Sequence, residues 1–217
     1  MNLSKSKQQS GFTLVEIAIV LVIIGILLAG VLKGQSLINN GRIKGLVNNM
    51  NAVSASYNGY VDRYQAIPGT EKNITFTARG WPTTMTPGTA PLALAPGTTF
   101  TDAGDQITFW QSLGAAGFFA YSPIATTNPP SATGGSIGVA ITPYTTVPGL
   151  SVCLNNVTGL QAEGIDTVVD GPLPASNIGA NGGSLQGDTA AAPAGAAPAA
   201  IAYSETSAAM WILCRPL

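Results

Sequence analysis

A run of 21 residues with a single charge constrains this chain most. From Phe12 to Leu32 the sequence reads FTLVEIAIVLVIIGILLAGVL, and Glu16 is the only charged residue in it. As a helix rising about 1.5 Å per residue, this run would be roughly 31 Å long, whereas the core of a bilayer is about 30 Å thick. The sequence therefore predicts a single transmembrane helix over residues 12–32.

The polar segment before the run indicates how the chain would be processed. Residues 1–11 read MNLSKSKQQSG and carry Lys5 and Lys7. A secretory signal has a shorter apolar core with a small-residue cleavage site behind it. Here the small residue, Gly11, comes before the apolar run. We therefore expect the apolar helix to stay on the chain as an anchor, with any cleavage on its polar side.

Glu16 is the anomaly of the apolar run. A carboxylate at the centre of a membrane helix costs about 2.5–3.5 kcal/mol, and less near an end, so such residues usually have a partner. No basic residue lies within one helical turn of Glu16. If the chain were cut after Gly11, the new amine of Phe12 could be that partner, from the same chain or from a neighbouring one. The alternative is an unpaired, protonated Glu16 near the membrane interface.

Composition excludes several classes of function. The chain has no histidine, which excludes His-based catalytic triads and His-ligated zinc. From Asn73 onward there are seven acidic residues and only two basic ones. Nucleic-acid binding usually needs a basic patch, so we expect no nucleic-acid partner. Without a nucleophile–base arrangement in the sequence, we predict no catalytic residues, no cofactor and no enzymatic activity.

Two pairs of aspartates are weak candidates for calcium binding. They are Asp102 with Asp105 and Asp166 with Asp170. Neither pair resembles an EF-hand loop, and solvated turns use the same residues. We therefore predict no metal site.

The two cysteines, Cys153 and Cys214, are the only ones in the chain. They could form one disulfide that closes a loop of about sixty residues, which would contribute about 4 kcal/mol in the chain-entropy model. Such a bond persists only in an oxidising compartment. The alternative is a pair of reduced, buried thiols.

The residues around the start of the apolar run resemble a known motif. Residues 11–16, GFTLVE, resemble the processing motif of type IV prepilins and of type II secretion pseudopilins. The resemblance implies cleavage between Gly11 and Phe12 by a prepilin peptidase, and N-methylation of Phe12. It also implies that Glu16 pairs with the N-terminus of a neighbouring subunit during assembly.

The segment after the apolar run extends the predicted helix. Apolar residues between Leu37 and Tyr64 recur mostly at spacings of three and four, as in an amphipathic helix. Residues 31–69 resemble the stem of pilin-like proteins, without the proline that many type IV pilins carry about twenty residues into this helix. We predict one helix of about fifty residues over 12–66, with Tyr57, Tyr60 and Tyr64 packed against a head.

The predicted fold class is α+β, a long N-terminal helix packed on an antiparallel β-sheet head with a C-terminal disulfide loop. The division is a leader at 1–11, the helix at 12–66, a head at 67–217 and a disulfide-bounded region at 153–214. Within the head we expect short helices at 105–116 (N-cap Asp105) and 158–169, a hairpin of strands 136–142 and 150–154, and a final strand at 208–214. Residues 70–104, apart from one short strand, and the exposed stretch 179–200 are expected to be loops.

The resemblance implies a structural subunit of a type IV pilus that assembles into a helical filament with the pilus assembly machinery. It also implies that Cys153 and Cys214 form the C-terminal disulfide of such pilins. Before assembly the chain would lie in the inner membrane with its N-terminus in the cytoplasm, and afterwards in an extracellular pilus. The alternatives are a type II secretion pseudopilin and a minor pilin acting in adhesion or DNA uptake.

Overall fold

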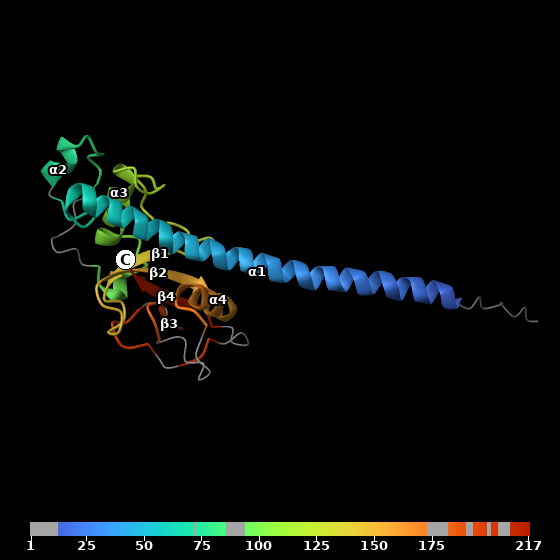
Figure 1. The fold of residues 1–217 in the computed structure, drawn as a ribbon. Helices are drawn as coiled ribbons and strands as arrows, with labels where there is room; N and C mark the ends of the chain where they lie inside the picture. Colours follow the sequence, from blue (N-terminus) through green and yellow to red (C-terminus); the bar gives the residue numbers. More distant parts are fainter. Residues whose placement is uncertain are drawn as a thin grey trace, which may run out of the picture. The chain divides into compact units, whose positions relative to one another are not determined.

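The computed structural model describes residues 13–71, 73–85, 94–172, 182–189, 193–198, 201–203 and 209–217. The chain divides into two compact units, Met1–Asn40 and Gly41–Leu217, and each is described by itself. Figure 1 shows the helices and strands in chain order.

The predicted long helix is confirmed as α1, which covers Leu14–Tyr64 and has 51 residues. It ends two residues earlier than the predicted boundary, because Gln65 adopts a left-handed conformation with φ 52°. The Gln65 N–H still bonds to the carbonyl of Val61, at 2.8 Å. A residue in this conformation commonly follows the last turn of a helix and ends it.

The second unit contains a four-stranded antiparallel sheet in the order β1–β2–β4–β3 (Figure 1). The strands are β1 (Ile137–Ile141), β2 (Leu150–Val157), β3 (Gln186–Asp188) and β4 (Trp211–Pro216). The predicted hairpin is therefore confirmed as β1 and β2, and the predicted final strand as β4. β2 runs three residues further than expected, through an irregularity between Leu154 and Val157.

The part of α1 after Gly41 shares one apolar core with the sheet. Its buried side chains repeat at spacings of mostly three and four, which places them on one face of the helix. The sheet contributes alternate residues of β1, β2 and β4 to the same core. The helix residues in this core are Ile43, Leu46, Val47, Met50, Val53 and Tyr60, and the strand residues are Ile137, Val139, Val152, Leu154, Val157, Trp211 and Leu213. This arrangement confirms the predicted fold class.

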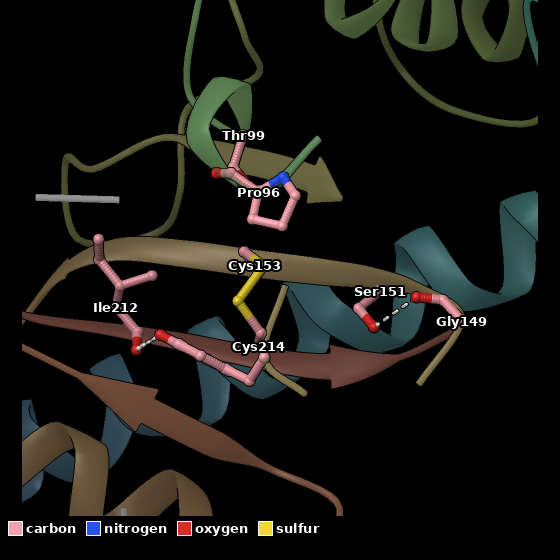
Figure 2. Close-up of a disulfide and its surroundings, with 8 residues drawn as sticks. Pro96, Thr99, Gly149, Ser151, Cys153, Ile212 and Cys214 are labelled. Carbon is pink, nitrogen blue, oxygen red and sulfur yellow. Dashed lines mark hydrogen bonds between the residues drawn. A yellow bond between two sulfur atoms is a disulfide. The ribbon is translucent and has the colours of Figure 1, made fainter. Parts of the chain in front are cut away.

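The disulfide lies on the other face of the same sheet. Cys153 of β2 and Cys214 of β4 are directly opposite each other and joined, and both are fully buried. Figure 2 shows Pro96 and Thr99 beside the bridge; Pro96 begins a short 3-10 turn, η1 (Pro96–Thr98), and Thr99 is its C-cap. Apolar residues that pack around the bridge are Tyr144, Val147, Ile212 and Phe100. The disulfide therefore stands in a second, smaller core.

Two further helices confirm the expectations for 105–116 and 158–169. They are α3 (Gly104–Ala115) and α4 (Gly159–Val169). The prediction that Asp105 is the N-cap of α3 is wrong. The N-cap is Ala103, which makes no side-chain hydrogen bond, and Asp105 lies in the first turn of the helix. Gly104 takes φ 57° at the helix start, and the cap lies two residues earlier than the predicted one.

Two expected loops contain regular structure. Residues 70–104 include α2 (Asn73–Ala78) and η1, and their described part contains no strand; residues 72 and 86–93 of this stretch lie outside the described residues. The stretch 179–200 includes β3, where Leu185 and Gln186 are buried instead of exposed. A three-residue edge strand leaves too short a pattern to identify among glycines and alanines.

Candidate assembly site

The first turn of α1 holds Glu16 in a reciprocal pair of hydrogen bonds. The Thr13 N–H and the Thr13 hydroxyl each donate to Glu16 Oε2, both at 2.8 Å. In return, the Glu16 N–H donates to the Thr13 hydroxyl oxygen at 3.3 Å. These contacts form a capping box, which satisfies amides that the first turn of a helix leaves free. A carboxylate at this end also interacts favourably with the helix dipole.

The capping box gives the Glu16 carboxylate hydrogen-bond partners within its own chain. From the sequence, the expected partner of this carboxylate was a free amine, and the alternative was protonation. The structure shows a different partner, Thr13, three residues earlier in the chain. The spacing Thr-x-x-Glu was present in the sequence as a capping signal. Glu16 itself is exposed, so the carboxylate stays accessible to a group from outside the chain.

The side chains of residues 14–32, apart from Glu16, are apolar and exposed. Leu14 is 91% exposed and Leu27 is 62% exposed. Every described side chain from residue 13 to 33 is exposed. Among the described residues, α1 is the helix that is long and apolar enough to cross a membrane. This much uncovered apolar surface is unfavourable in water, so this stretch requires an apolar environment that the chain does not supply.

Comparison with known families identifies the same segment. Residues 6–32 match the family described as the prokaryotic N-terminal methylation motif. The comparison with curated proteins and the comparison with solved structures each returned no match. The matched residues comprise the end of the polar segment before the helix, the expected cleavage site and the apolar run up to Leu32.

The match identifies one feature of the chain. The chain carries, over residues 6–32, the N-terminal methylation motif that type IV pilins and type II pseudopilins share. Such a motif implies processing by a prepilin peptidase and handling by an assembly machinery. The apolar helix that follows is consistent with anchoring in the inner membrane before assembly into a pilus-like filament.

The predicted site residues fall in different places. Gly11 and Phe12 lie outside the described residues. Glu16 stands in the first turn of α1, in the unit Met1–Asn40. Cys153 and Cys214 form the predicted disulfide in the unit Gly41–Leu217. The two aspartate pairs are not joined by a third acid, histidine or cysteine in a group that could hold a metal, among the residues that the structure describes.

A buried carboxylate near the end of α1 was not identified from the sequence. Glu71 is 8% exposed and accepts hydrogen bonds from the Tyr60 hydroxyl and, at 3.1 Å, from the Gly69 N–H. Arg79 forms an ion pair with Glu71 at 3.2 Å, and its guanidinium lies 4.1 Å from the centre of the Tyr64 ring. Burial and this carboxylate together raise the pKa of Tyr60. Through these contacts, Glu71 and Arg79, which follow α1 in the chain, are held against Tyr60 and Tyr64 in the last turns of α1.

Proposed function

We propose that this chain is the structural subunit of a type IV pilus, made as a prepilin and polymerised through its N-terminal helix. The observation that carries the proposal is the methylation motif at residues 6–32, which runs into an apolar helix whose side chains are exposed among the described residues. The buried disulfide supports a head that matures in an oxidising compartment.

The proposed division of the chain follows from this role. Residues 1–11 form a leader that is removed, 12–66 the assembly helix with its membrane part at 12–32, and 67–217 the head with a disulfide-bounded region at 153–214. The N-terminus faces the cytoplasm while the chain is in the inner membrane. After assembly the head lies outside the cell, as part of the pilus.

Three residues have proposed roles in processing and assembly. The peptidase cuts after Gly11, and the new amine of Phe12 is methylated. That amine carries a positive charge, and in the filament it pairs with the Glu16 carboxylate of a neighbouring subunit. The exposed position of Glu16 supports this role, because the carboxylate that now accepts bonds from Thr13 is reachable by a second chain. An ion pair in apolar surroundings is stronger than the same pair in water.

The experiment that tests this role compares sheared surface fibres from cells carrying the native chain, Glu16→Ala or Asp62→Asn. Asp62 is an exposed acid in the last turns of α1, which makes it the matched control. We expect Glu16→Ala to leave the chain in the membrane and to reduce its amount in fibres at least tenfold. Asp62→Asn should give fibres at the native level. Fibres at the native level from Glu16→Ala would contradict the proposed pairing.

The pseudopilin is the second candidate, because the same motif serves both classes. The two are separated by where the mature chain collects. A pilus subunit is recovered in sheared fibres, whereas a pseudopilin stays in the cell envelope. A minor pilin would be recovered in fibres at a small fraction of their total protein. The excess of acidic over basic residues from Asn73 onward disfavours DNA as a ligand of such a minor subunit.

A further inference from the structure

The C-terminal end of α4 contains a buried carboxyl group with an unsatisfied oxygen. Asp166 is 1% exposed, and its Oδ2 atom has no hydrogen-bond partner. No basic side chain forms an ion pair with it among the described residues. A buried carboxylate with an unsatisfied oxygen and no cation is costly, and such groups usually carry a proton or have a charge partner. The state of Asp166 therefore requires an explanation.

The neighbour of Asp166 is a second carboxyl group, one turn further along the helix. Asp170 caps the end of α4, and residues four apart on a helix share a face. The Asp170 carboxylate accepts the hydroxyl of Ser184 at 2.6 Å and the N–H of Leu185 at 2.7 Å. These two bonds attach the segment just before β3 to the end of α4.

Gly183 allows this close attachment. It has φ 74°, and a Cβ atom there would lie 2.5 Å from Asp170 Oδ2. Any other residue would be strained at this φ and would also collide with the carboxylate. The approach of residues 183–185 to Asp170 is therefore a specific feature of the fold.

The other ionisable groups around the pair come from separate segments. The Tyr203 side chain hydrogen-bonds to Asp166. Arg215 of β4 is within electrostatic range of Asp170, but its guanidinium donates to Asn51 and Ser54. Further away, Tyr144 interacts with Tyr203, and Asp188 interacts with Tyr144. None of these groups supplies a cation in contact with Asp166.

We propose that Asp166 and Asp170 form a pH-sensitive clasp, in which protonated Asp166 donates to the Asp170 carboxylate and so holds residues 183–185 and β3 against α4. The unsatisfied Oδ2 of Asp166 is the atom that carries the proton. When the proton leaves, two carboxylates face each other in a site without a cation, and the clasp loosens. The segment released is the edge of the sheet.

The direction of the pH effect follows from where the proton is held. Burial, followed by the nearby Asp170 charge, raises the pKa of Asp166 from an ordinary value of 3.8 to about 7. Between these values the closed clasp binds more protons than the open chain, so its stability falls as pH rises. The clasp is therefore tightest near pH 4, weakens up to about pH 7, and changes little above that.

The test is hydrogen exchange on the full chain in detergent micelles, from pH 4 to pH 9. The readout is the protection factor of the Leu185 amide, corrected for the intrinsic effect of pH on exchange. In the native chain we expect protection to fall by up to about tenfold per pH unit until about pH 7, and then to level off. Asp166→Asn, which resembles the protonated form, should keep protection nearly constant over the whole range.

Two further variants make the result specific. Glu163→Gln removes a carboxylate from the same helix and should leave the native pH dependence unchanged. Asp170→Asn removes the neighbouring charge and should move the levelling point to lower pH, which a purely structural role would not do. An equal pH dependence in Asp166→Asn and the native chain would overturn the proposal. So would restored protection at pH 8 on adding Ca²⁺ to the native chain alone, because the pair would then be a cation site.

Discussion

The two stretches of α1 share one backbone geometry and differ in what surrounds their side chains. Before Gly41 the large apolar residues are exposed, as with Leu27 at 62%. After Gly41 the apolar residues on one face are buried, as with Leu46 and Met50 at 0%. A long helix in water depends mostly on packing of an apolar face. The first stretch must therefore obtain that packing from outside the chain, which on the proposed function means lipid first and neighbouring subunits afterwards.

The glycines of α1 show the same difference. A Cβ atom added at Gly25 would meet nothing within 4 Å, whereas one added at Gly45 would lie 2.9 Å from the Cβ of Ala132. Gly45 is thus needed for close packing inside the second unit. The space around Gly25 is available to another molecule.

The largest expected effect concerns the disulfide, which stabilises only the second unit. Replacing both Cys153 and Cys214 by alanine should lower the free energy of unfolding of that unit by about 4 kcal/mol, because the bridge closes a loop with a sequence separation of 61 residues. The measurement is urea unfolding followed by tryptophan fluorescence. All three tryptophans lie in the second unit. An unchanged midpoint would show that the bridge adds nothing to the head.

The next effect separates the two stretches of α1 directly. Leu46→Ala should lower the free energy of unfolding of the second unit by about 3 kcal/mol, since it opens a cavity in the shared core. Leu27→Ala makes the same chemical change in the first stretch and should leave the fluorescence transition unchanged. If the two variants unfolded at the same urea concentration, the contrast between the stretches would be wrong.

A smaller effect is expected at the end of α1, where Arg79 neutralises Glu71. Arg79→Met should destabilise the second unit by about 2 kcal/mol, because it leaves a buried carboxylate with neutral partners only. Arg63 is the matched control, since it also lies over the Tyr64 ring, at 5.5 Å, but is exposed. Arg63→Met should change the urea midpoint little. Equal losses from both variants would assign the effect to the aromatic contact and not to the ion pair.

The smallest effect uses the two capping boxes, one in each unit. Thr158 and Gln161 exchange bonds at the start of α4, at 3.1 and 3.4 Å, in the same way as Thr13 and Glu16 at the start of α1. Thr158→Ala should destabilise the second unit by about 1 kcal/mol. Thr13→Ala should leave the fluorescence transition where it is. A shift caused by Thr13→Ala would mean that the two units unfold together.

The strongest patterns in the sequence predicted the long helix α1. The apolar run with its single charge and the spacing of residues such as Met50 and Tyr60 were sufficient to predict α1, because a helix repeats its buried positions over many turns. β3 was missed, since three residues beside glycines carry no measurable period. The prediction of Asp105 as the cap was wrong because an aspartate inside the first turn of a helix gives the same local signal as an aspartate at the cap.

The candidate site was predicted in part. Glu16 stood out because a charge in an apolar run is unfavourable, but its bonds to Thr13 were not anticipated. The bonds from Ser184 and Leu185 of the later loop to Asp170, beside the buried Asp166, could not be predicted from the sequence. Groups that meet only through tertiary packing leave no spacing pattern along the chain.

The most direct test of the central claim is the intact mass of the subunit in sheared surface fibres from the native cell. We predict a chain that begins at Phe12 and carries one added methyl group. Its mass should be two hydrogens lower than that of the reduced chain because of the Cys153–Cys214 bond. A chain that still carries residues 1–11, or one found only in the cell envelope and never in fibres, would contradict the claim that this protein is a pilus subunit.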